Sequence, residues 1–217
     1  QYLKDQIKFR KTHKHINKAN EVLSLLIEAE GLELSETELL HQCIFMLNAG
    51  HETSTNMLSH GLNELINHRD QYKSLQKEPG RIDTAIDEIL RFQPPIQINN
   101  RRCLEKTKLG DVVVPEGTSV HMIIAGANRD PLQFLEPETF DISRSPNRHL
   151  SFGLGIHICA GIYLARIEAK VAFQSLMSSF REINLLKKPK VANRIRFREI
   201  KEMQPTSILV IVDAFSR

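Results

Sequence analysis

The chain has 217 residues, a formal net charge of +3 and a hydrophobic fraction of 41%. This balance excludes strongly basic nucleic-acid-binding proteins and highly charged disordered ones, and it allows a sizeable core. The widely spaced Cys43, Cys103 and Cys159 include no C-x-x-C pair, which argues against a secreted disulfide framework or a structural zinc site and favours reduced thiols in the cytoplasm.

The first 68 residues predict helices. Residues 1–30 read as two helical pieces, the second of which carries apolar residues at helical spacing and stops at Gly31. The N-terminal stretch "QYLKDQIKFRK" resembles neither a signal peptide nor an anchor, and no membrane segment is expected because no run of about 18 apolar residues occurs. Ser35 and Glu38 have capping-box spacing and start a proline-free helix to about residue 68. At ~1.5 Å per residue that helix would cross the middle of a larger fold.

The rest of the chain mixes one more pair of helices with short strands. A helix is expected over 81–92, ended by Pro94 and Pro95, and β structure over 96–128 with a type I turn at 114–117. An irregular meander is expected over 129–150, a helix from Cys159 to about Phe180, and closing strands at 194–198 and 207–212. The predicted fold class is mainly α with minor β.

The stretch "HLSFGLGIHICAG", residues 149–161, places Cys159 among glycines at the start of a predicted helix. A helix N-terminus stabilises a thiolate, and Gly153 and Gly155 permit close approach of a flat group to the backbone. Three interpretations stay open on spacing alone. Cys159 is a buried free thiol, a nucleophile with His157 as its base, or a single axial thiolate ligand to haem iron.

The middle of the long helix, "NAGHETST" at residues 48–55, is mostly polar. These groups either face solvent or bond back to helix carbonyls, or they form a site. In the second case Ala49 and Gly50 leave room for a flat ligand, while Glu52 and Thr53 hold water and open the helical hydrogen-bond ladder locally.

The segment "FGLGIHICAGIYLAR", residues 152–166, resembles the haem-binding signature F-G-x-G-x-H-x-C-x-G-x-x-L-A-R of the cytochrome P450 superfamily, in the form common among soluble bacterial members. The resemblance implies that Cys159 is the proximal iron ligand, that Phe152 packs near its sulfur, and that His157 hydrogen-bonds a haem propionate. Implied contacts with the cofactor, iron protoporphyrin IX (haem b), also come from Gly153, Gly155, Gly161, Ala49 and Gly50. Dioxygen is the implied co-substrate, and the electrons come ultimately from NAD(P)H.

The stretch A-G-x-E-T-S, residues 49–54, resembles the oxygen-activation motif A/G-G-x-D/E-T-T/S of the same family. This resemblance implies that Thr53 donates a hydrogen bond to bound dioxygen and that Glu52 helps to relay protons through ordered water. Ser54 stands where threonine is commoner in the family.

Glu88 and Arg91 lie three residues apart and therefore on one helix face. An isolated pair of this kind is usually exposed and contributes only about 0.2–1 kcal/mol. The pair also matches the family's E-x-x-R, a buried network behind the haem whose third partner is an Arg or His of the meander. Thr139 occupies that third position here, and Arg144 is the candidate substitute.

The resemblance also indicates a propionate partner and the walls of a substrate pocket. Arg101 fits the family's propionate-binding arginine. The polar Gln97, Asn99 and Asn100 suggest hydrogen bonding to an oxygenated substrate. The expected pocket residues are Ile96, Gln97, Ile98, Met203 and Gln204.

The whole resemblance maps to the carboxyl half of the family, so residues 1–217 are expected to be that part of one domain, with the amino-terminal half absent and one helix flank bare. Self-association or a missing partner segment is expected. The implied parent is a monooxygenase that hydroxylates or epoxidises a small organic substrate, with a ferredoxin or flavodoxin-type electron donor and no nucleic-acid partner. The alternatives are a truncated, non-catalytic fragment that binds haem weakly or self-associates, and a cysteine hydrolase using Cys159 and His157.

Overall fold

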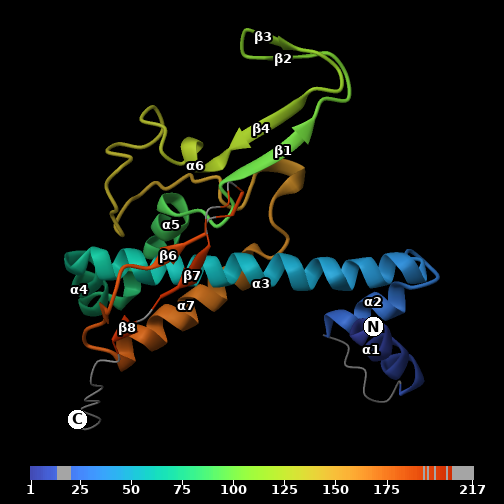
Figure 1. Cartoon of the computed structure of the whole chain (residues 1–217), viewed down its shortest axis with the longest axis horizontal. Coiled ribbons are helices and arrows are strands. Elements are labelled where there is room, and N and C mark those ends of the chain that lie inside the picture. The colour runs from blue at the N-terminus through green and yellow to red at the C-terminus, as the bar shows by residue number, and fades with distance from the viewer. Residues whose placement is uncertain (14–20, 193, 195, 198, 204, 207–217) are drawn as a thin grey trace. The chain divides into compact units, whose positions relative to one another are not determined.

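The computed structural model describes residues 1–13, 21–192, 194, 196, 197, 199–203, 205 and 206. The chain divides into two compact units, Gln1–Glu52 and Thr53–Arg217. Figure 1 shows the elements in chain order. The helices are α1 (Tyr2–Thr12), α2 (Val22–Ala29), α3 (Glu36–Asn67), α4 (Arg69–Lys77), α5 (Ile82–Phe92), α6 (Ile124–Ala127) and α7 (Ile162–Ser179), with 3-10 turns at Pro79–Arg81 and Gly155–His157.

In the first unit, α1, α2 and the start of α3 share a small core. Ile7, Leu39 and Cys43 are buried in it, and this burial raises the pKa of the Cys43 thiol. The capping box is confirmed, because the Ser35 N–H donates to Glu38 Oε2 at 2.8 Å and the Glu38 N–H donates to Ser35 Oγ at 3.3 Å. The long helix therefore starts where the sequence predicts.

In the second unit, α5 is the centre of the core. Its apolar residues recur at helical spacing and pack between the later part of α3 and α7. Buried members of this core include Leu75, Ile82, Ala85, Ile86, Ile89, Leu90, Ala169 and Phe173. At Gly61 of α3, an added Cβ would lie 2.5 Å from Phe173 Cζ and 3.0 Å from Ile89. Close packing of α3 against α5 and α7 therefore depends on a glycine at this position.

We expect Gly61→Ala to lower the free energy of unfolding by about 1–3 kcal/mol, because the added methyl group overpacks the contact with Phe173. Gly50→Ala, on the same helix, is the control. A Cβ at Gly50 would meet nothing within 4 Å, so alanine should instead gain about 0.5–1 kcal/mol from its helix propensity. Urea unfolding of both variants measures the difference, and equal stabilities would show that the Gly61 contact is wrong.

The described strands pair as small antiparallel two-stranded sheets. In the largest, Ile98 pairs with Ile123 and Arg102 with Ser119. The strand pairs are β1 (Ile98–Arg102) with β4 (Ser119–Ile123), β2 (Thr107–Leu109) with β3 (Val112–Val114), β5 (Asn184–Leu185) with β8 (Pro205–Thr206), and β6 (Lys190–Val191) with β7 (Ile200–Glu202). Together with the helices, these sheets confirm the predicted class, mainly α with minor β.

Three local predictions need correction. The turn before β4 runs over Pro115–Thr118, where the Thr118 N–H donates to Pro115 O at 3.3 Å. Gly117 has φ +77° in the third position, so the predicted type I turn one residue earlier is wrong. Helix α4 was not predicted, although its apolar Tyr72 and Leu75 lie three residues apart on one face and are buried.

The predicted strand at 194–198 is also wrong for the residues described there. Phe197 makes an isolated bridge to Ile96, and the Gln97 N–H donates to Arg196 O at 2.8 Å. The segment therefore touches the chain just before β1, while the paired strands β6 and β7 lie on either side of it in sequence. The strand predicted at 207–212 lies outside the described residues.

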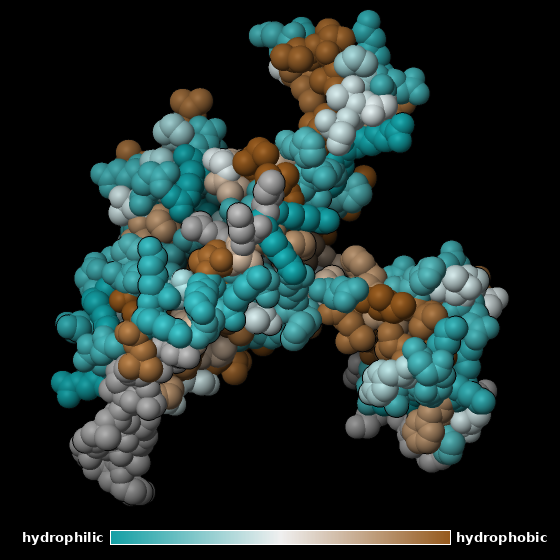
Figure 2. Space-filling view, viewed as in Figure 1, coloured by the Kyte–Doolittle hydropathy of each residue, from teal (hydrophilic) through white to brown (hydrophobic). Residues whose placement is uncertain are grey.

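Apolar side chains are exposed in several places. Figure 2 shows them gathered on the β2–β3 hairpin, where Leu109, Val112 and Val113 are exposed. Tyr163, Leu164, Ile167 and Val171 of α7 are exposed as well. None of the helices in the described part of the chain is long and apolar enough to cross a membrane.

Candidate functional site

The loop before α7 folds back on itself to present Cys159. The Cys159 N–H donates to Phe152 O at 2.8 Å, and the Ile158 N–H donates to Gly155 O at 3.1 Å. Gly153 has φ +73°, and a Cβ there would lie 3.0 Å from the His157 carbonyl oxygen, so this turn requires glycine. The result is an exposed thiol at the N-terminal end of an 18-residue helix.

The surface around Cys159 suits a flat apolar group. Leu154 and Ile158 are exposed and Ile156 is 97% exposed, although all three are large apolar side chains. A Cβ added at Gly155 would meet nothing within 4 Å. Among the described residues, no group of three or more His, Cys, Asp or Glu could hold a metal ion. A lone thiolate beside an apolar surface fits a metal whose remaining ligands come from a macrocycle such as haem.

The two other interpretations of Cys159 fare less well. The thiol is exposed, so the buried-hydrophobe interpretation is wrong for Cys159, whereas it describes Cys43. A nucleophile needs a base within hydrogen-bond reach. His157 is exposed, and no contact between the described His157 and Cys159 side chains supports such a pair.

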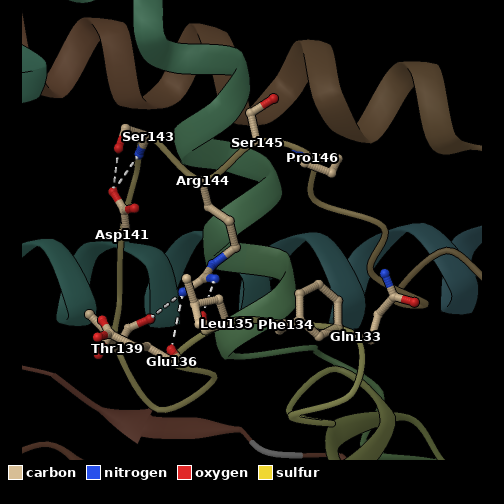
Figure 3. A pocket seen from close by; sticks show the side chains of 10 residues that line it. All are labelled: Gln133, Phe134, Leu135, Glu136, Thr139, Asp141, Ser143, Arg144, Ser145 and Pro146. Atoms are coloured by element: carbon tan, nitrogen blue, oxygen red, sulfur yellow. Dashed lines mark hydrogen bonds between the residues drawn. The ribbon is translucent and has the colours of Figure 1, made fainter.

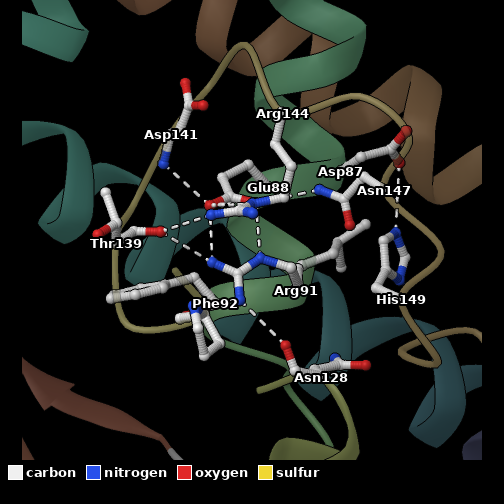
Figure 4. A network of polar contacts seen from close by, with 12 residues as sticks. Asp87, Glu88, Arg91, Phe92, Asn128, Thr139, Asp141, Arg144, Asn147 and His149 are labelled. Carbon is white, nitrogen blue, oxygen red and sulfur yellow. Dashed lines mark hydrogen bonds and ion pairs between the residues drawn. The ribbon is translucent and has the colours of Figure 1, made fainter. Parts of the chain in front are cut away.

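The Glu88–Arg91 pair is fully buried, with 0% exposure of both side chains, so the surface-pair interpretation is wrong. Arg91 Nε donates to Glu88 Oε2 at 2.7 Å, and Arg91 Nη2 donates to Glu88 Oε1 at 2.8 Å. Figure 4 shows this two-pronged contact. Arg91 also donates to the carbonyls of Asn128, Pro137 and Thr139 at 2.8–3.0 Å. The pair therefore ties α5 to the meander.

Arg144 supplies the third member of this network. Its Nε lies 3.1 Å from Glu88 Oε2, and its side chain is nearly buried. Thr139 takes part only through its carbonyl oxygen, which accepts from both arginines. Asn147 Nδ2 and the Asp141 N–H donate to Glu88 as well, at 3.0 and 2.9 Å. Two guanidinium groups thus share one buried carboxylate whose hydrogen bonds are well satisfied.

A pocket in the meander is part of this scaffold. It is lined by residues between Gln133 and Pro146 and shares none of them with the cysteine loop. Figure 3 shows Arg144 reaching across it, where the guanidinium donates to the carbonyls of Leu135 at 2.7 Å and Glu136 at 3.2 Å. Because the Arg144 guanidinium is already bonded to these backbone carbonyls, it holds the meander in place and is not available to bind a ligand in this pocket.

Asn128 also holds the loop, a role that sequence analysis missed. It is fully buried, its Oδ1 accepts the Leu150 N–H at 2.7 Å, and its Nδ2 donates to Ser151 Oγ at 3.0 Å. The Ser151 hydroxyl in turn donates to Leu90 O at 2.7 Å. The start of the cysteine loop is thereby fixed to α5. The one signal in the sequence was the asparagine itself, within the stretch "ANRDP" at residues 127–131.

The polar middle of α3 lies on an uninterrupted helix, so the expected local opening of its hydrogen-bond ladder is not seen. Ala49 and Gly50 are exposed in the first unit, and Glu52, also in that unit, is partly buried. Thr53 begins the second unit and is partly buried. Its neighbour Ser54 donates to Glu168 Oε2 of α7 at 2.8 Å. This bond ties the helix that carries Thr53 to the helix that follows Cys159.

Arg101 is exposed on β1, where its Nη1 donates to the Asn100 carbonyl at 2.9 Å. The polar residues near it have partners within the chain. The Gln97 side-chain amide donates to Pro94 O, and Asn99 Oδ1 accepts the Asn100 N–H at 2.9 Å. Their hydrogen bonding to an oxygenated substrate stays a prediction.

The other predicted pocket residues are partly buried or lie outside the described residues. Ile96, Ile98 and Met203 are partly buried. Asn100 Oδ1 lies 2.7 Å from His121 Nδ1, across the β1–β4 pair. Gln204 is outside the described residues.

A lone, glycine-framed thiol at a helix N-terminus, backed by a buried Glu–Arg network, defines a haem-thiolate class of protein. The chain belongs to the cytochrome P450 family, whose model matches residues 1–199. It is 38% identical over 185 residues to a biotin biosynthesis cytochrome P450 from Bacillus subtilis strain 168, covering 85% of this chain and 46% of that relative. Cytochrome P450 119 from Sulfolobus acidocaldarius is 39% identical over 181 residues, covering 83% and 48%.

Solved structures agree with this assignment. The complex of P450BioI with hexadec-9Z-enoic acid ligated acyl carrier protein superposes with a TM-score of 0.87 at 37% identity. The tirandamycin C-bound P450 monooxygenase TamI gives a TM-score of 0.87 at 32% identity. Each alignment covers 94% of this chain and 52% of the other. The chain therefore spans about half the length of the relatives that it matches.

Proposed function

We propose that the natural polypeptide carrying this chain is a haem-thiolate monooxygenase that hydroxylates or epoxidises a small organic substrate. The exposed Cys159 in its glycine loop, on an apolar surface at the start of α7, carries this proposal. In this proposal residues 1–217 are the carboxyl-terminal part of one P450 domain. Nearly the whole chain superposes on about half the length of each of these two structures, which supports that view.

The residues proposed to hold haem b are those that match the family's motifs. Cys159 would be the iron ligand, while His157 and Arg101 are exposed cations or donors suited to propionate carboxylates. Haem, when bound, supplies the iron at which dioxygen is activated, with electrons from NAD(P)H through a ferredoxin or flavodoxin-type donor. The family motifs would add Phe152, Gly153, Gly155, Gly161, Ala49 and Gly50 as contacts of the ring.

Thr53 and Glu52 would handle protons. The Thr53 hydroxyl would donate a hydrogen bond in the active site, and the Glu52 carboxyl group would take up protons from solvent and pass them toward Thr53 through ordered water, which is general acid work. The Ser54–Glu168 hydrogen bond supports this assignment, because it fixes the turn of α3 that carries Thr53 against α7.

Apolar side chains at Ile96, Ile98 and Met203 support an apolar wall for the substrate, so we propose a carbon-rich molecule. The names of the neighbours are consistent with such ligands in the family, since one binds a fatty acyl carrier protein and another tirandamycin C. The proposal places the protein in the cytoplasm, where its three free cysteines would stay reduced.

For the 217-residue chain by itself, a second candidate is a non-catalytic fragment that binds haem weakly or self-associates. The exposed apolar side chains of α7 favour it, because an isolated chain would tend to cover them. Sedimentation velocity on the purified chain tests this candidate. A monomer at high concentration that takes up no haem would argue against it.

We expect Thr53→Ala in the natural polypeptide to keep haem and substrate binding but to lower product formation on the order of 10²-fold, because a positioned proton donor is lost. NAD(P)H oxidation should continue, with its electrons diverted to hydrogen peroxide. Product, NAD(P)H and peroxide are measured together. Thr55→Ala, two residues further along α3, is the matched control and should couple as the wild type does. Tight coupling in Thr53→Ala would refute the role assigned to Thr53.

A further inference from the structure

Three segments of the second unit meet at the Asp87 carboxylate, which the roles described above do not use. Arg166 Nη2 of α7 lies 2.7 Å from Asp87 Oδ1, and His149 Nε2 lies 3.3 Å from the same oxygen. Figure 4 shows the contact with His149. His149 precedes the cysteine loop and Arg166 follows it, so one side chain of α5 bridges both ends of the loop.

The hydrogen bonds fix the tautomer and the orientation of His149. Its side chain is only 4% exposed. Nδ1 accepts the Ser151 N–H at 3.2 Å, so Nε2 carries the ring proton and donates it toward Asp87. The ring thus spans from α5 to the backbone of the loop.

Both partners of Asp87 also contact Phe152. The His149 and Phe152 ring centroids lie 6.0 Å apart, and the Arg166 guanidinium carbon lies 5.5 Å from the centre of the Phe152 ring. Phe152 in turn accepts the Cys159 N–H at its carbonyl oxygen, at 2.8 Å. A chain of contacts therefore runs from Asp87 through its partners and Phe152 to Cys159.

The carboxylate is charged under ordinary conditions. Burial raises the pKa of Asp87, but the hydrogen bonds from His149 and Arg166 and the positive charge of Arg166 outweigh this effect and leave the pKa below its usual value. Two neighbouring acids of α5 thus have different tasks, since Glu88 holds the meander and Asp87 faces the loop.

We propose that Asp87 is a positioning residue for Cys159, acting through His149, Arg166 and Phe152 to hold the loop in the conformation that ligates haem iron. This inference rests on the proposed haem-thiolate function. A second acid of α5 provides a matched comparison, because Asp83 bonds Lys170 of α7 at 2.9 Å and so joins the same two helices without contacting the loop.

The test compares Asp87→Asn with Asp83→Asn in the natural polypeptide purified with haem. Asparagine keeps the size of Asp87 and an acceptor for His149 but loses the charge that holds Arg166. We expect the thiolate-type carbon-monoxide band of Asp87→Asn to convert to a non-thiolate band on the order of tenfold faster than in the wild type. Asp83→Asn should convert at the wild-type rate. Equal conversion in the two variants would overturn the proposal.

Haem-free protein supplies a second readout that separates this proposal from the function. The rate of iodoacetamide labelling of Cys159, followed by mass spectrometry, should differ several-fold between Asp87→Asn and Asp83→Asn, because the thiol is already exposed and its reactivity follows the conformation of the loop. If the wild type itself shows no thiolate band, the proposed function fails, and the labelling rates still decide the positioning role. Should Asp87→Asn not fold, Arg166→Gln replaces it, with the same expected results; wild-type behaviour in that variant overturns the proposal.

Discussion

Replacing Cys159 with serine is expected to abolish the red-shifted thiolate band of the reduced carbon-monoxide difference spectrum, together with monooxygenase turnover. A serine hydroxyl is a poor ligand for haem iron, and the described part of the chain holds no cluster of alternative metal donors. The measurement is a difference spectrum of each variant of the natural polypeptide at matched haem content.

Cys103→Ser is the control for this experiment. Cys103 is a free, partly buried thiol outside the loop, bonded through its backbone to Thr118 and Gly117, so its replacement should leave the band in place. Survival of the band in Cys159→Ser would mean that the iron ligand is misassigned. Hydrolysis of esters or amides that disappears on alkylation of Cys159 would favour the hydrolase instead.

Arg91→Met is expected to lower the free energy of unfolding by about 3–5 kcal/mol, which is the cost of leaving a buried charge without its main partner. Glu88 would keep Arg144 and Asn147 but lose both short bonds from Arg91, and the carbonyls of Asn128, Pro137 and Thr139 would lose their donor. Urea unfolding measures the loss. Arg91→Lys should recover only part of it, because an ammonium group cannot reproduce the planar two-pronged contact.

A control with the same spacing lies one helical element earlier. Glu78 and Arg81 are also three residues apart and bonded at 2.9 Å, but their side chains are 56% and 42% exposed. Arg81→Met should therefore change stability by less than about 1 kcal/mol. Similar losses in the two variants would show that burial does not decide the strength of the Glu88–Arg91 pair.

Local sequence signals were enough to predict helices α3 and α5. The capping box at Ser35, the proline-free run behind it and the Pro94–Pro95 stop predicted α3 and α5 closely, because each depends on neighbouring residues. Prediction failed for a short helix that is held mainly by residues far away in the sequence. Helix α4 is an example, since Tyr72 is anchored through a hydrogen bond from its hydroxyl to the Phe180 carbonyl at 2.8 Å.

The candidate site divides in the same way. Spacing alone marked Cys159, Gly153 and Gly155, because the loop is contiguous in sequence. The burial of Glu88 and its contact with Arg144 were predicted from the family resemblance and not from spacing, since Arg144 is 56 residues away. The contact between Asp87 and His149 could not be predicted from spacing, because the two residues are 62 positions apart in the sequence.

The apolar tip of the cysteine loop has a consequence for biogenesis. Leu154 and Ile156 are exposed on a turn in which Gly153 and Gly155 have positive φ angles. A newly synthesised chain therefore exposes an apolar patch until a flat ligand covers it. Other nascent chains would associate with this patch.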